Sequence, residues 1–94
     1  MIEIQLDKPR KVEFTMRAFR TYKIDTGHSI LSNGIAEVDE EVMVDLTFAG
    51  LIGADKDMSL TKDEISDYLD FPVFKEVLEE MKGGIKKLQG DEKK

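Results

Sequence analysis

The sequence predicts an α+β fold that is mainly helical, with an N-terminal β-hairpin followed by about four helices in a single domain over residues 1–90. Two short segments near the N-terminus alternate apolar and polar residues, which is typical of half-buried strands. Beyond residue 15 the apolar residues recur with helical spacing instead. A chain of 94 residues has room for one hydrophobic core.

The hairpin is expected over residues 2–15. Its inward-facing residues are Ile2, Ile4, Leu6, Val12 and Phe14. Pro9 lies in the connector and has no N–H for a ladder hydrogen bond, so we place it in the turn. Because an isolated hairpin is marginal in water, this one must cover helices.

A first helix is expected over residues 16–26. Thr15 is a plausible N-cap whose hydroxyl accepts from a free N–H of the first turn, and Gly27 suits the left-handed residue past the end. The predicted inward face comprises Met16, Phe19 and Lys23, with Ala18 and Tyr22 at its flank. A short turn of helix is expected after Ser29, followed by turn residues 32–34.

The central helix is expected over residues 39–53, with Asp39 as its cap. Residues 42–52 are apolar at nearly every position, which is typical of a helix buried on most sides. Gly50 and Gly53 lower the helix propensity, but they permit close approach by a neighbour or an end near Gly53.

Two more helices are expected, over residues 62–70 and 72–88. Thr61 and Glu64 have the spacing of a capping box, and Ile65, Tyr68 and Leu69 are expected to face inward. Pro72 suits the first turn of the last helix. Residues 83–84, both glycine, are expected to weaken that helix in its middle, and residues 91–94 are expected to form a disordered tail.

The last helix carries one long apolar stripe. Such a stripe can pack on the chain's own core, which the sequence favours, on a second copy or on a partner helix. The candidate partner-binding residues are Phe74, Val77, Leu78, Met81 and Ile85. The acidic stretch of residues 37–45 is expected to lie around them.

The absence of cysteine excludes a disulfide scaffold, a thiolate zinc site and a cysteine nucleophile, and it fits a reducing compartment. The first residues lack the apolar core of a secretory signal. The longest apolar-rich run, residues 48–54, is too short to span a bilayer. We therefore expect a cytoplasmic protein.

The net charge of −6 is concentrated in the middle of the chain, where residues 28–60 hold one basic and seven acidic side chains. An acidic middle disfavours nucleic-acid binding, which needs a basic face. The alternative function is a small regulatory nucleic-acid-binding protein that uses Arg17, Arg20 and Lys23 of the first helix. We interpret these three cations as spread around that helix, which argues against a nucleic-acid-binding face.

No pattern of catalytic residues or of metal ligands is complete. Asp55, Asp57 and Ser59 match the first ligands of a calcium loop, but the glycine and the glutamate that should follow are absent. His28 has no second ligand nearby in the sequence. We predict neither an enzyme nor a cofactor or metal.

The order of elements resembles that of the small tail assembly chaperones of long-tailed phages and prophages, and of related proteins in gene transfer agents. The matching motifs are Thr26-Gly27 at the end of the first helix, "FAGL" at residues 48–51, and "LT" at residues 60–61 with Glu64. The resemblance covers about residues 2–88.

This resemblance implies a non-enzymatic role in virion assembly in the host bacterial cytoplasm. Chaperones of this family coat the long helical tape-measure protein, keep it soluble and bring tail-tube subunits to it. Many are also made in a longer, frameshifted form. The partners expected from the resemblance are therefore a tape-measure protein and a tail-tube protein. Separately from the resemblance, a homo-oligomer is a further option.

Overall fold

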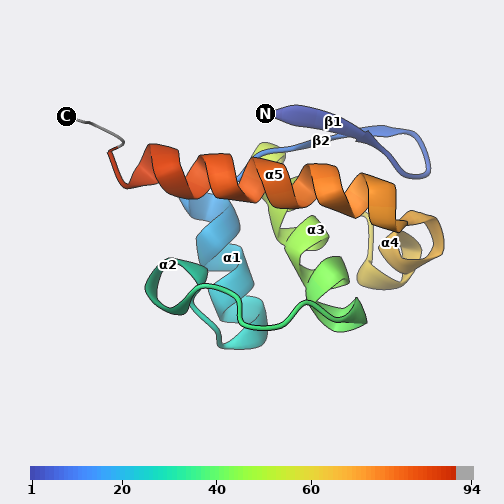
Figure 1. The fold of residues 1–94 in the computed structure, drawn as a ribbon. Coiled ribbons are helices and arrows are strands. Elements are labelled where there is room, and N and C mark those ends of the chain that lie inside the picture. Colours follow the sequence, from blue (N-terminus) through green and yellow to red (C-terminus); the bar gives the residue numbers. More distant parts are fainter. Residues whose placement is uncertain (91–94) are drawn as a thin grey trace.

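The computed structural model describes residues 1–90 and confirms a mainly helical α+β fold that begins with a two-stranded hairpin (Figure 1). The described elements are β1 (Ile2–Gln5), β2 (Pro9–Val12), α1 (Met16–Thr26), α2 (Ile30–Asn33), α3 (Glu40–Ala54), α4 (Lys62–Tyr68) and α5 (Phe71–Leu88). The short helical turn expected after Ser29 is α2, so the described residues contain five helices. The tail predicted over residues 91–94 lies outside the described residues.

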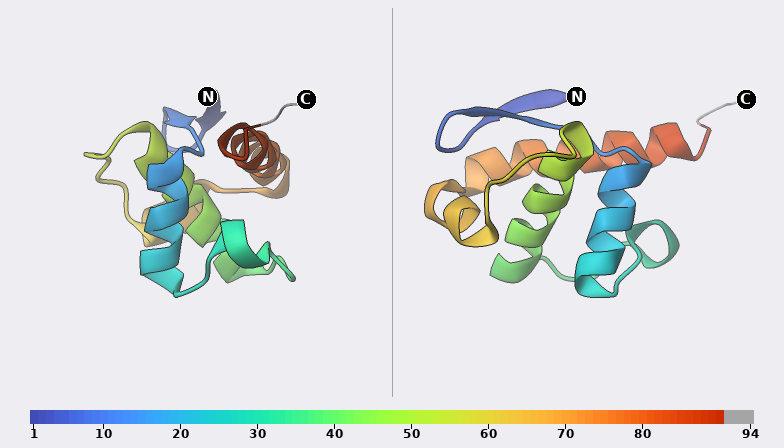
Figure 2. Two further views of the ribbon diagram at one scale, coloured as in Figure 1. Left: turned by 90° about the vertical axis from the view of Figure 1, so that its left-hand side faces the viewer. Right: turned by 180° about the vertical axis from the view of Figure 1, so that it is seen from behind.

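Helices α1 and α3 lie side by side, and α5 runs across them, with the hairpin beside it (Figures 1 and 2). Helix α4 lies beside α3 near the start of α5. One cluster of buried side chains includes residues from every described element. Its members include Ile4, Val12, Phe19, Ile30, Leu46, Leu51, Ile65, Phe74 and Val77.

The hairpin is antiparallel, with Ile2 opposite Val12 and Gln5 opposite Pro9. The prediction that Pro9 belongs to the turn is wrong, because Pro9 opens β2. The first residue of a strand is a position that tolerates a missing N–H. The turn is instead closed by Asp7, whose carboxylate accepts hydrogen bonds from the Arg10 guanidinium at 2.9 and 2.8 Å.

Helix α1 has the predicted bounds, and Gly27 ends it at a φ of 79° with its N–H donating to the Lys23 carbonyl at 2.7 Å. Thr15 occupies the N-cap position, but its side chain makes no capping hydrogen bond. The Thr15 hydroxyl oxygen is buried and has no hydrogen-bond partner among residues 1–90, so the predicted role of that hydroxyl is wrong.

The buried face of α1 also differs from the prediction. Ala18, Phe19 and Tyr22 are buried as expected, whereas Met16 and Lys23 are exposed. The buried residues of α1 lie on the side that packs against α3, and Met16 lies on another side. Helical spacing predicted the correct period but placed the centre of the face incorrectly.

Helix α3 begins at the predicted cap, where the Asp39 carboxylate accepts from the Val42 N–H at 3.0 Å. The predicted close approach at its glycines is confirmed. The Glu13 N–H donates to the Gly50 carbonyl at 3.0 Å, and a Cβ built on Gly53 would lie 2.1 Å from the Glu13 carbonyl oxygen. The segment between β2 and α1 therefore lies directly on α3.

The corner between α4 and α5 is defined by two caps. Both hydrogen bonds of the capping box between Thr61 and Glu64 are present. Helix α4 ends at Tyr68, before the predicted end at residue 70, because Asp70 caps α5 through the Val73 N–H at 2.9 Å. Tyr68 was expected to face inward but is 49% exposed.

Helix α5 begins at Phe71, with Pro72 in its first turn as predicted, and runs to Leu88 without a break. Contrary to expectation, residues 83–84 do not interrupt the helix, since the helical geometry of α5 continues through them. Gly84 is buried against the segment that precedes α1, whereas Gly83 is exposed. Gly84 thus permits close packing of α5 rather than interrupting it.

Candidate functional site

The stripe predicted to bind a partner faces the chain's own core. Phe74, Val77 and Met81 are only 4%, 0% and 6% exposed, and Leu78 and Ile85 are half-buried against the same cluster. The first three residues therefore offer almost no accessible surface in this structure. We correct the prediction accordingly: the stripe packs α5 on the chain's own core, against α3 and the hairpin, which is the alternative that the sequence favoured.

An accessible apolar surface lies instead in a groove of about 460 Å³ between the start of α3 and the corner of α4 and α5. Its lining residues are Glu40, Glu41, Met43, Val44, Ser66, Leu69, Asp70 and Phe71. The apolar lining comes from α3 and the corner, and three of the lining residues carry carboxylates. The groove joins part of the predicted acidic stretch to the first residue of the last helix.

Phe71 is the most exposed large apolar side chain of the described residues, at 74%. It is the first residue of α5, where Asp70 caps the helix and Pro72 follows. These neighbours fix the backbone at Phe71, because proline restricts both its own φ and the conformation of the residue before it. Phe71 thus lines the groove while most of its side chain stays exposed.

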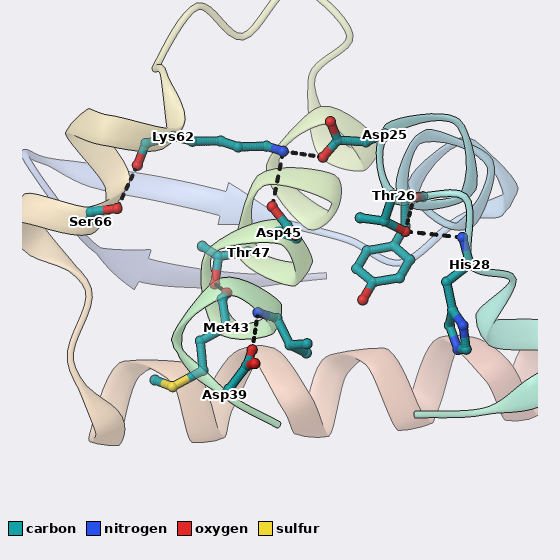
Figure 3. Close-up of polar contacts among 11 residues, drawn as sticks. Asp25, Thr26, His28, Asp39, Met43, Asp45, Thr47, Lys62 and Ser66 are labelled. Atoms are coloured by element: carbon teal, nitrogen blue, oxygen red, sulfur yellow. Dashed lines mark hydrogen bonds and ion pairs between the residues drawn. The ribbon is translucent and has the colours of Figure 1, made fainter. Parts of the chain in front are cut away.

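Lys62 fixes the start of α4 relative to α1 and α3 (Figure 3). Its ammonium group lies 2.9 Å from the Asp45 carboxylate of α3, pairs with the Asp25 carboxylate of α1 and lies 5.5 Å from the centre of the Phe48 ring. Desolvation lowers the pKa of Lys62, but the hydrogen bonds to the two carboxylates outweigh it, and the pKa is raised. This contact keeps α4 against α3, and α4 supplies Ser66 to the groove.

The alternative candidates Arg17, Arg20 and Lys23 are all exposed on α1. The interpretation that they are spread around the helix is wrong, because residues three apart in an α-helix are neighbours on its surface. Met16 and Ile24, 56% and 71% exposed, lie on the same side. Within residues 1–90 none of the three cations forms an ion pair. This cationic and apolar surface, composed of Met16, Arg17, Arg20, Lys23 and Ile24, is called the α1 face below.

His28 has a local structural role. Its Nε2–H donates to the Gly34 carbonyl at 2.7 Å, and its ring meets the buried Tyr22 ring edge-on. These contacts hold the end of α2 close to the end of α1. Among residues 1–90, no group of three or more histidine, cysteine, aspartate or glutamate side chains could hold a metal ion.

The residues that sequence reasoning missed are Phe71, Met16 and Ile24. Phe71 lies three residues before Phe74, so helical spacing alone would assign it to the buried stripe. Met16 was placed in the core for the same reason. The exposure of these side chains depends on where neighbouring elements end, and local spacing carries no signal for that.

Comparison of the chain with protein-family models, curated proteins and solved structures finds no match. In the described part of the chain, no helix combines the length and apolar character that crossing a membrane requires.

Proposed function

We propose that this chain is a non-enzymatic protein-binding module that holds an apolar helical segment of another polypeptide in the groove between α3 and the α4–α5 corner. The observation that carries the proposal is the exposed Phe71 beside the apolar residues Met43 and Leu69. Helix-in-groove recognition commonly uses an amphipathic helix laid into an apolar groove. Bulky apolar side chains of a partner helix would fill this one.

The particular role proposed is that of a phage or prophage tail assembly chaperone in the bacterial cytoplasm. It rests on the resemblance in element order and motifs given above. The client would be the tape-measure protein, and the chaperone would recruit tail-tube subunits to it. The groove and the net charge of −6 support this role, because a chaperone for an apolar client needs apolar contact surface and charge that keeps the complex soluble.

The test is co-expression of the protein with the tape-measure protein of its own operon, followed by affinity purification. Phe71→Ser is the informative variant, because Phe71 is exposed and its loss should leave the fold intact. Tyr68→Ser is the matched control, since Tyr68 is also an exposed aromatic residue but does not line the groove. Val77→Asp is unsuitable, because Val77 is fully buried and an unpaired charge there would unfold the protein.

We expect the wild type and Tyr68→Ser to co-purify with the tape-measure protein and Phe71→Ser to lose most of it. Failure of the wild type to co-purify would contradict the assignment as a tail assembly chaperone. Equal capture by Phe71→Ser and the wild type would show that the client binds elsewhere than the groove.

A further inference from the structure

The α1 face is a second surface that the monomer leaves unpaired. It combines two apolar side chains that are more than half exposed, Met16 and Ile24, with three cations that form no ion pair within residues 1–90. Met16, Arg20 and Ile24 are successive positions four residues apart, so they form one row along the helix. A surface of this composition suits an acidic partner that also offers apolar contact.

The groove has the complementary composition. Glu40, Glu41 and Asp70 contribute negative charge, and Met43, Val44, Leu69 and Phe71 contribute apolar surface. Among the described residues, neither Glu40 nor Glu41 takes part in an ion pair. Complementary charge of this kind steers association and selects the partner, while the apolar contacts supply much of the affinity.

We propose that the groove of one copy binds the α1 face of a second copy, so that the protein self-associates head to tail. Arg20 and Lys23 would lie against the carboxylates of the groove, and Ile24 would contact its apolar lining. The groove would therefore be occupied by the cationic, partly apolar helix α1 of a second copy.

The two surfaces lie on different parts of one molecule. The α1 face lies on the side of α1 opposite its buried residues Ala18, Phe19 and Tyr22, whereas the groove involves the start of α3 and the α4–α5 corner. Helix α1 and that corner are separate parts of the fold (Figures 1 and 2). A contact between unlike surfaces is heterologous, so each added copy presents a further free groove and a further free α1 face. The assembly therefore grows as a chain or closes as a ring.

This inference rests on the groove of the proposed function, and the two uses of that groove compete. Self-association would cover the apolar lining until a client displaces the neighbouring copy. The failure of one proposal is distinguishable from the failure of the other, because self-association is measured on the purified protein and client capture on the co-expressed pair.

The experiment is sedimentation velocity of the full chain over a concentration series at low and high salt. The face variant carries Arg20→Gln and Lys23→Gln, and the groove variant carries Glu40→Gln and Glu41→Gln. A charge control carries Glu3→Gln and Glu79→Gln, exposed carboxylates that do not line the groove. The control changes the net charge by as much as the groove variant does.

The mean sedimentation coefficient of the wild type should rise with concentration and fall with salt, because added salt screens exposed charges. In the face variant and in the groove variant, the association constant should fall roughly tenfold, as expected for the loss of two exposed ion pairs. The charge control should behave as the wild type. An equimolar mixture of the face and groove variants should give a complex that stops at the dimer, because the pair retains one complete interface.

A wild type that stays monomeric at all concentrations would overturn the inference, as would an equal loss in the charge control or a mixture that fails to associate. The α1 face would instead be a nucleic-acid surface if a DNA or RNA oligonucleotide binds the monomeric wild type and not the face variant. If self-association behaves as expected while no tape-measure protein is captured, the proposed function is wrong and the inference stands.

Discussion

Gly84 of α5 packs directly against Phe14, so that a Cβ atom built on Gly84 would lie 2.4 Å from the Phe14 carbonyl oxygen and 2.7 Å from the Phe14 Cβ. Gly50 of α3 lies against the same segment, and a Cβ atom added there would lie 2.6 Å from Val12 Cγ1. The connection between β2 and α1 therefore contacts Gly84 of α5 and both Gly50 and Gly53 of α3. This arrangement brings α5 close to the hairpin and holds its apolar stripe in the core.

Gly84→Ala should destabilise the protein, whereas Gly83→Ala should not. The added methyl group at position 84 would collide with the backbone at Phe14, and overpacking of this kind costs about 1–3 kcal/mol. At position 83 nothing lies within 4 Å, and replacing an exposed helical glycine by alanine should stabilise by about 0.5–1 kcal/mol. Urea denaturation of both variants measures the difference, and similar midpoints for the two would contradict the role given to Gly84.

Replacing each of two N-cap threonines by valine should change the stability of the protein differently. Thr61→Val removes the side-chain acceptor of the Glu64 N–H and should cost about 1 kcal/mol. Thr15→Val removes a buried hydroxyl that has no hydrogen-bond partner among residues 1–90, so stability should stay level or rise. Thermal denaturation of the two variants checks this. A clear loss of stability in Thr15→Val would mean that its hydroxyl has a bonding role after all.

Lys62→Met should weaken the docking of α4, because it removes the cation shared by Asp25 and Asp45 but keeps the apolar part of the side chain. The Lys62 side chain is 37% exposed, so the expected cost is modest, at about 0.5–1 kcal/mol. Lys82→Met is the control, since the 3.5 Å pair of Lys82 with Glu79 is far more exposed and should contribute nothing measurable. Urea midpoints at low and high salt distinguish the two, because screening should weaken the Lys62 pairs in the wild type.

Tyr22 should make the protein sensitive to alkaline pH. Burial raises the pKa of the Tyr22 phenol above its ordinary 10.0, and the nearby Asp45 carboxylate adds to that rise. Because the pKa of Tyr22 is higher in the folded state than in the unfolded state, the phenol's contribution to stability is complete below pH 10.0. That contribution is lost as the pH rises through the pKa of the folded state. Lys62, whose pKa is raised above 10.5, acts in the same direction.

Tyr22→Phe should therefore lose less stability than the wild type between about pH 8 and about pH 11, although part of the decline remains because Lys62 still titrates. Urea midpoints measured across that range give the two profiles. Superimposable profiles would mean that the Tyr22 phenol has the same pKa in the folded and unfolded states.

The features that were predicted correctly are local ones. The cap at Asp39, the capping box of Thr61 and Glu64, and the left-handed Gly27 all depend on atoms within about one helical turn, so the residue types nearby are sufficient to specify them. The candidate site was predicted only in part. The acidic start of α3 was recognised, but the last-helix residues chosen beside it proved to be buried, and Phe71 was missed.

By itself, the sequence determined the hairpin, the order and approximate bounds of the long helices, and the surplus of negative charge, because period, caps and composition are properties of the chain. Only the tertiary structure decided that α5 covers the chain's own core, that Gly84 is a packing position, and that Phe71 and the α1 face stay exposed. These outcomes depend on which distant segments meet. The free energy of burial depends on which two surfaces come into contact, and no local sequence pattern specifies which distant surfaces these are.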